Sequence, residues 1–177
     1  MPQAVLSFWF DDIQPARWWK VDPGFDALIR SRFGALHDQA GRCELFGWRA
    51  TPAGRLAEVI ALDQFARHIH RGSPLAFAAD PLARRLTAEA LAKGWDAGLT
   101  NEERVFLYMP MMHGEDAESQ RRSVELFTAL GEEENRKFAV DHAEVFARFG
   151  RFPSRNAALG RETTAEERAY LDAGGGW

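Results

Sequence analysis

Apolar residues recur every three to four positions along most of this chain, which is the spacing of one face of an α-helix. One segment shows the spacing through Phe25, Leu28, Ile29, Phe33 and Leu36. No segment sustains the alternation of apolar and polar residues that is typical of a strand. The pattern therefore predicts helices over residues 3–11, 23–40, 52–70, 81–94, 101–113, 115–130, 135–149 and 164–172.

Capping residues and prolines mark where several of these helices begin. Asp22-Pro23, Thr51-Pro52 and Asp80-Pro81 each place an N-cap residue before a proline at the first helical position. The three signals lie 29 residues apart, but the segments that follow them share little else. We therefore expect an all-α fold, an antiparallel helix-hairpin stack of about eight helices, rather than a proven repeat.

Glycine and proline mark the places where helices end. Gly131 is expected to stop the helix at 115–130, and residues 150–161 are interpreted as a loop because they hold two glycines, a proline and three arginines. The length of 177 residues suits one domain spanning the whole chain. Its glycine-rich end, residues 171–177, is expected to be a mobile tail.

Charged residues continue the apolar stripe of the helix predicted at 52–70. The stripe runs on into Asp63, Arg67, His70 and Arg71. The opposite sector of the helix is apolar as well. A helix of this kind is mostly buried, so its charges must be paired or must line a pocket. Asp63 and Arg67 are four residues apart and can pair directly. A buried ion pair and a ligand pocket are both consistent with this stripe.

A second polar group follows a proline in an apolar helix. Pro110 has no N–H group and should kink or end the helix there, and Gly114 then permits a sharp turn. The break presents His113, Glu115 and Asp116 together at the start of the next helix. The helix dipole favours acids at that position, so N-capping is one interpretation. The other is a site in which His113 acts as a general base.

Two more polar residues lie in line with apolar faces. Gln120 shares a face with Asp116 and Phe127, and His142 shares a stripe with four apolar residues of its helix. The simplest interpretation of His142 is a core histidine with one hydrogen-bond partner. The alternative is that both residues line a pocket.

The segment that follows His142 is rich in arginine. Arg151, Arg155 and Asn156 lie in a stretch that Phe149 and Phe152 should anchor inward. Guanidinium groups bind carboxylates and phosphates with two parallel hydrogen bonds. The chain has 26 acidic and 22 basic residues, so pairing with its own acids is the competing interpretation.

Composition excludes several classes of function. The net charge of -4 gives no basis for a nucleic-acid surface. The single cysteine excludes an intrachain disulfide and fits a cytoplasmic protein, and no apolar run is long enough to cross a membrane. Nucleotide-loop and metalloprotease motifs are absent from the sequence, so we expect no cofactor. Nothing in the spacing of the candidate ligands demands a metal, and we expect none; these candidates are Asp63, His113, Glu115, Asp116 and His142.

Several motifs together resemble those of the bacterial family catalogued as domain of unknown function 924. They are Val5–Phe10, Leu62–Phe65, Ala76–Ala78 before Asp80-Pro81, Pro110–Asp116 and Arg148–Pro153. The resemblance covers nearly the whole chain and implies a tetratricopeptide-like helical fold, but it implies no reaction. The residues that match the family pattern are Asp63, Gln64, Arg67, Arg71, His113, Glu115, Asp116, Gln120, Arg151, Arg155 and Asn156. The chain departs from the pattern at Ala66, His68, Gly114 and Ser154.

These residues predict a pocket between the third, fifth, sixth and seventh helices, closed by the arginine loop. Three hypotheses follow. The chain is a binding module for a small anionic molecule or a peptide carboxylate, a hydrolase or transferase, or a protein whose polar cluster is only structural. In the enzyme hypothesis His113 is the base, oriented by Asp116 or Asp63. The sequence leaves the oligomeric state open.

Overall fold

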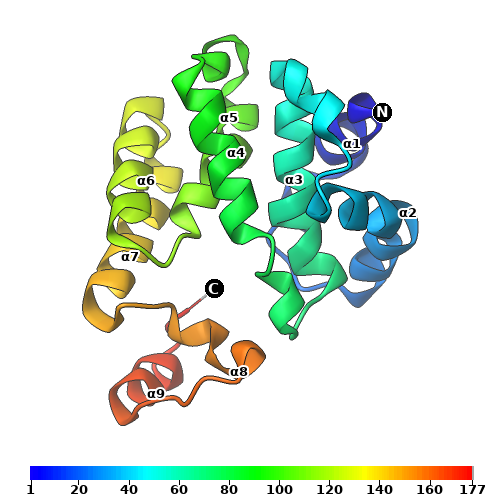
Figure 1. Cartoon of the computed structure of the whole chain (residues 1–177). Coiled ribbons are helices and arrows are strands. Elements are labelled where there is room, and N and C mark those ends of the chain that lie inside the picture. The colour runs from blue at the N-terminus through cyan, green and yellow to red at the C-terminus, as the bar shows by residue number, and fades with distance from the viewer. Residues whose placement is uncertain (177) are drawn as a thin grey trace. The chain divides into compact units, whose positions relative to one another are not determined.

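The computed structural model describes residues 1–176, and within them every regular element is helical. Figure 1 shows the α-helices, which are α1 (Pro2–Leu6), α2 (Pro23–Gly41), α3 (Pro52–Ile69), α4 (Asp80–Ala92), α5 (Asn101–Met112), α6 (Ala117–Leu130), α7 (Glu133–Phe149), α8 (Asn156–Leu159) and α9 (Ala165–Asp172). The all-α stack predicted from the hydrophobic pattern is confirmed. A specific relation to tetratricopeptide repeats stays a prediction.

Most of the predicted helix starts are confirmed by their caps. The Asp22 carboxylate accepts a hydrogen bond from the Phe25 N–H at 3.0 Å, and the Thr51 hydroxyl accepts one from the Gly54 N–H at 3.1 Å. Asp80 is the exception, because α4 begins at Asp80 itself and has no side-chain cap. Its carboxylate instead binds Arg67 of α3, which removes it from the capping position.

Other boundaries differ from the sequence expectation. Helix α5 continues through Pro110 to Met112, so the chain breaks at His113 rather than at the proline. The segment predicted as a loop contains a 3₁₀ turn (Pro153–Arg155) and the one-turn helix α8. Helix α9 includes Leu171 and Asp172, as the predicted helix at 164–172 does, so the predicted tail at 171–177 overlaps the end of this helix. Trp177, also in the predicted tail, lies outside the described residues.

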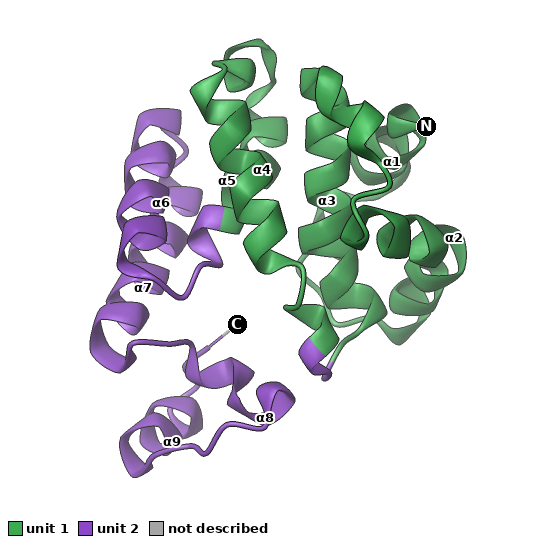
Figure 2. Cartoon of the chain, in the orientation of Figure 1, with its two compact units in different colours: residues 1–71, 75–110 green, residues 72–74, 111–177 purple. Residues whose placement is uncertain are grey.

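The chain divides into two compact units, coloured in Figure 2. Unit 1 comprises Met1–Arg71 and Leu75–Pro110, and unit 2 comprises Gly72–Pro74 and Met111–Trp177. In the part of the chain that the structure describes, no helix is both long and apolar enough to cross a membrane.

Helix α3 is the centre of unit 1. It packs against α1, α2 and α4, and its residues are buried on nearly every side, as the sequence predicted. An aromatic cluster that includes Phe8, Trp9 and Phe65 fills the space beside it. Gly54 allows the chain to approach α3 closely, because a Cβ atom there would lie 2.1 Å from the Trp48 carbonyl oxygen.

Unit 2 is built on the pair α6 and α7. Gly131 and Gly150 end these two helices with φ of 80° and 70°, in the left-handed region that glycine adopts without strain. Gly131 was predicted to stop α6, and this is confirmed. The 3₁₀ turn after α7 contacts both α8 and α9, so the arginine-rich segment is packed against short helices.

Candidate functional site

The charged stripe of α3 contributes to an ion triad in which half-buried Arg67 lies between the buried acids Asp63 and Asp80. Arg67 Nη1 lies 3.1 Å from Asp63 Oδ1, and the guanidinium donates two hydrogen bonds of 3.0 Å to the Asp80 carboxylate. Burial acts to lower the pKa of Arg67, but the two carboxylates outweigh it and raise that pKa above its ordinary value. Gln64 donates to Asp63 Oδ2 at 2.5 Å. The predicted Asp63–Arg67 pair is confirmed, and Asp80 is the partner that the sequence did not indicate.

Arg71 is exposed and pairs with the buried Asp26 of α2. Its guanidinium donates to the two Asp26 oxygens at 2.6 and 2.8 Å, and His68 Nδ1 lies 2.7 Å from Asp26 Oδ1. Burial acts to raise the pKa of Asp26, but hydrogen bonds from Arg71 and His68 lower it below its ordinary value. Burial lowers the pKa of His68 despite the neighbouring carboxylate. Neither Asp26 nor His68 was a predicted site residue.

In unit 2, the two acidic residues after Gly114, Glu115 and Asp116, accept hydrogen bonds from neighbouring backbone and side-chain groups. Glu115 accepts hydrogen bonds from the Phe152 N–H at 2.8 Å and from Arg161 at 2.8 and 2.6 Å. Burial opposes ionisation of Glu115, yet Arg161 and the Phe152 N–H lower its pKa. Asp116 is the N-cap of α6 and accepts from the Ser119 N–H at 2.8 Å. The capping interpretation of Asp116 is therefore confirmed.

Gln120 and the two histidines of unit 2 surround the same turn. Gln120 Nε2 donates to the carbonyl oxygens of Met112 and Gly114 at 2.8 and 2.6 Å, which closes the turn. His142 is buried and its Nδ1 lies 2.7 Å from the Phe138 carbonyl oxygen. The rings of His113 and His142 are 6.2 Å apart between centroids. His142 thus has the geometry of a core histidine.

The arginine segment is anchored by Glu167 of α9. Arg151 donates to the Glu167 carboxylate at 2.6 and 2.8 Å, and Asn156 Nδ2 donates to it at 3.2 Å. The Arg151 hydrogen bonds lower the pKa of Glu167 to about 2. Arg155 Nη2 donates to the His113 carbonyl oxygen at 3.0 Å. Glu167 lies 16 residues from Arg151. The capping-box spacing of Thr164 and Glu167 predicted its place at the start of α9, which is confirmed, but did not indicate its pair with Arg151.

The predicted site residues fall into two groups. Asp63, Gln64, Arg67 and Arg71 belong to unit 1, whereas His113, Glu115, Asp116, Gln120, His142, Arg151, Arg155 and Asn156 belong to unit 2. The predicted pocket draws on both groups and stays a prediction. So does the role of Asp63 as the residue that orients His113.

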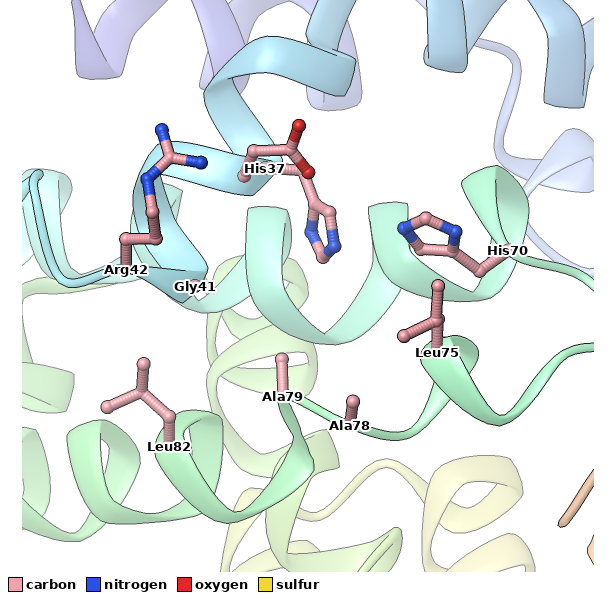
Figure 3. A pocket seen from close by; sticks show the side chains of 9 residues that line it. His37, Gly41, Arg42, His70, Leu75, Ala78, Ala79 and Leu82 are labelled. Carbon is pink, nitrogen blue, oxygen red and sulfur yellow. The ribbon is translucent and has the colours of Figure 1, made fainter.

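Unit 1 also contains a pocket of about 350 Å³ that the sequence did not predict. Its lining comes from the end of α2 and just beyond it, from the residue after α3, and from the segment before α4 and the first turn of α4. The lining residues are His37, Asp38, Gly41, Arg42, His70, Leu75, Ala78, Ala79 and Leu82. In Figure 3 the rings of His37 and His70 point toward one another across this space.

The two histidines of the pocket are held differently. His37 is buried, and its Nδ1 lies 2.9 Å from the Ala61 carbonyl oxygen of α3, so Nδ1 carries the proton and donates. His70 is half-buried and caps the end of α3. Burial, followed by the neighbouring His37, lowers the pKa of His70. The sequence feature that could have indicated this pocket is His37, which stands four residues after Phe33 on the buried face of α2.

The chain matches the sequence model of one protein family over residues 5–175, described as "bacterial protein of unknown function (DUF924)". Among solved structures it is similar to a protein of unknown function, ATU0120, from Agrobacterium tumefaciens. The TM-score is 0.92 and the identity 40%, with 97% of each chain covered. No curated protein matches the chain. The family resemblance found in the motifs is confirmed.

Proposed function

This chain belongs to the bacterial family DUF924, which is described as proteins of unknown function, and we propose that it is a binding module for a small ligand with a carboxylate or another anionic group. The ligand would occupy the pocket of unit 1. The observation that carries the proposal is one cavity of about 350 Å³ that combines an aliphatic wall with the ring nitrogens of two histidines.

The size and lining of the pocket suit a small molecule. Ligand sites are typically clefts of roughly 300–1,000 Å³, mainly apolar with a few polar groups that fix orientation. Here Leu75, Ala79 and Leu82 supply the apolar side, and the polar groups come from α2 and the end of α3. A ligand with a short aliphatic body and one charged end would match both sides.

The charges at the pocket favour an anion at the polar end. Arg42 and His70 offer nitrogen donors, and Asp38 is the opposing carboxylate. His37 already donates its Nδ1 proton to the Ala61 carbonyl oxygen, so its Nε2 is an acceptor. Arg42 is paired with Glu44, but both side chains are at least half exposed. An exposed pair of this kind contributes about 0–1 kcal/mol, so the Arg42 guanidinium can exchange Glu44 for a ligand carboxylate at little cost.

The location differs from the one that the sequence suggested. Arg67, Arg71 and Arg151 first indicated an anionic ligand, and each donates to a carboxylate of its own unit. These pairs favour a structural role for the three arginines. The hydrolase or transferase hypothesis with His113 as general base stays a prediction. We place the protein in the cytoplasm, since its exposed free thiol, Cys43, suits a reducing compartment.

A thermal-shift screen with small carboxylates and phosphates tests the proposal. A ligand at about a hundred times its dissociation constant stabilises the native state by roughly 2.7 kcal/mol, which is a melting shift of very roughly 5–11 °C for a chain of this size. The Ala79→Leu variant, which fills the pocket, should lose the shift. The matched control is Ala88→Leu, at an exposed position of α4, the helix that follows Ala79, and it should respond as the parent does.

The screen also separates the two sources of a carboxylate. A free metabolite should bind with its whole body inside the pocket, whereas a peptide would place only its C-terminal residue there. Short peptides with a free or an amidated C-terminus form the second arm of the screen. The proposal fails if no anion shifts the melting temperature, or if Ala79→Leu and Ala88→Leu respond alike.

A further inference from the structure

Two imidazoles and a carboxylate meet in the pocket of unit 1. His37, Asp38 and His70 each present a ligand-type atom, and these atoms all lie within 4.8 Å of one another. We propose that these three residues form a binding site for one divalent transition-metal ion, with Zn²⁺ as the test ion. The site was not predicted from the sequence, from which we expected no metal.

The donor types select the class of metal. Imidazole nitrogen suits zinc, copper, nickel and iron, whereas magnesium and calcium prefer sites made of oxygen. Two histidines and one carboxylate are also the protein ligands of many zinc sites that keep a position open. The pair of histidines therefore favours a first-row transition ion over the more abundant hard cations.

The three donor atoms need to move only a short way to reach one ion. Bonds of about 2.0–2.2 Å to a tetrahedral zinc ion set the ligand atoms about 3.3 Å apart, so donor atoms separated by as much as 4.8 Å must approach by about 1.5 Å. Asp38 is exposed and His70 half-buried, and neither side chain is confined in the core. Rotation of these two side chains can bring their donors to an ion held by His37.

His37 is already oriented as a metal ligand. Its Nδ1–H donates to the Ala61 carbonyl oxygen at 2.9 Å, which leaves the lone pair of Nε2 available. Metal-binding histidines almost always donate their second ring nitrogen in this way, because the hydrogen bond fixes the tautomer and the ring orientation. The ring is buried, so its position is set before any ion arrives.

The ion would also explain how an anionic ligand is accommodated beside Asp38, and this part of the inference rests on the proposed function. A divalent ion that is bound to one carboxylate carries a net charge of about +1. Three protein ligands leave at least one coordination position open, and the pocket adjoins it. A ligand carboxylate would bind the ion there while its body contacts the aliphatic wall.

The test uses the full chain without a histidine tag, first stripped of metal by a chelator. Titration with Co²⁺ should give one equivalent of the visible absorption of a nitrogen-coordinated cobalt ion, and calorimetry with Zn²⁺ should give one site per chain. His70→Gln and Asp38→Asn alter side chains outside the core, so these variants should fold. Each should weaken Zn²⁺ binding at least about tenfold.

Two matched variants control for the loss of any histidine or aspartate. His113→Gln changes a half-buried histidine of unit 2, and Asp141→Asn changes an exposed aspartate on a helix; both should bind Zn²⁺ as the parent does. The inference is overturned if the parent chain binds no metal at one equivalent. It is also overturned if His70→Gln binds like the parent, or if the controls lose binding equally.

Failure of the metal site and failure of the proposed function give different results. Metal binding without any response to carboxylates retains the metal site and removes the proposed function. A carboxylate response in chelator-treated protein that binds no metal removes the metal site and retains the proposed function. If both hold, the carboxylate shift should be larger in the Zn²⁺-loaded chain and should fall in His70→Gln.

Discussion

Removal of Arg67 should destabilise unit 1 more than any surface substitution. Arg67 is the cation shared by Asp63 and Asp80, and the side chains of these acids are 1% and 9% exposed. Without the guanidinium, two carboxylates stay buried close to each other. Removing one partner from a buried ion pair typically costs about 3–5 kcal/mol. For a chain of this size, that is a fall in melting temperature of about 6–20 °C.

The assay can report on unit 1 in particular. Five of the six tryptophans lie within residues 1–110, so urea unfolding followed by tryptophan fluorescence monitors mainly this unit. The variant is Arg67→Gln, and the matched control is Arg85→Gln, which breaks an exposed pair with Glu89 within unit 1. The control should cost about 0–1 kcal/mol.

A second variant gives an independent readout. Arg67→Gln leaves the buried carboxylate of Asp80 without the Arg67 guanidinium. The double variant Arg67→Gln, Asp80→Asn removes one of the two buried charges together with the cation, so it should recover part of the lost stability. The reasoning is refuted if Arg67→Gln costs no more than Arg85→Gln, or if the double variant is no more stable than Arg67→Gln alone.

Two further predictions test unit 2 and the close approach in unit 1. Because Arg151 lowers the pKa of Glu167 to about 2, the pair stabilises the fold above the unfolded pKa of about 4.3, and this stability should be lost as the pH falls toward 2. Acid titration of urea stability should show this loss in the parent and not in Arg151→Gln; equal profiles would contradict it. Gly54→Ala should destabilise the chain by about 1–3 kcal/mol, since its Cβ would lie 2.1 Å from the Trp48 carbonyl oxygen. Gly34→Ala, on α2 with open space around it, should instead stabilise by about 0.5–1 kcal/mol, and the comparison fails if both variants melt alike.

The helices were predictable because their signals are local. Asp22 and Thr51 cap the helices that follow them, and the apolar spacing between such signals sets the buried faces. Asp80 shows the limit of this reasoning. It stands before a proline just as Asp22 does, yet its carboxylate binds Arg67 on another helix. A contact between helices decided its role, and spacing along the chain carries no information about that contact.

The candidate site was predictable only in part, for the same reason. The Asp63–Arg67 pair lies within one helix and follows from a separation of four residues. The pocket depends instead on the way α2 crosses α3. His37, near the end of α2, reaches Ala61 in the middle of α3 and lies 5.3 Å from the His70 ring between centroids. Helix crossing is a property of packed surfaces, so the sequence pattern did not reveal it.

Ion pairs to two neighbouring helices hold the end of α3 and the residues just beyond it, which affects the entropy of ligand binding. Arg67 in this turn binds Asp80 of α4, and Arg71, two residues beyond the end of α3, binds Asp26 of α2. His70 lies between these two ion-paired arginines in the sequence, so the backbone that carries it is already ordered before a ligand binds. Association with a pre-organised site avoids most of the entropy lost when a loop must be immobilised. Binding at this pocket should therefore show little change in backbone hydrogen exchange around residue 70, and its affinity should depend mainly on side-chain contacts.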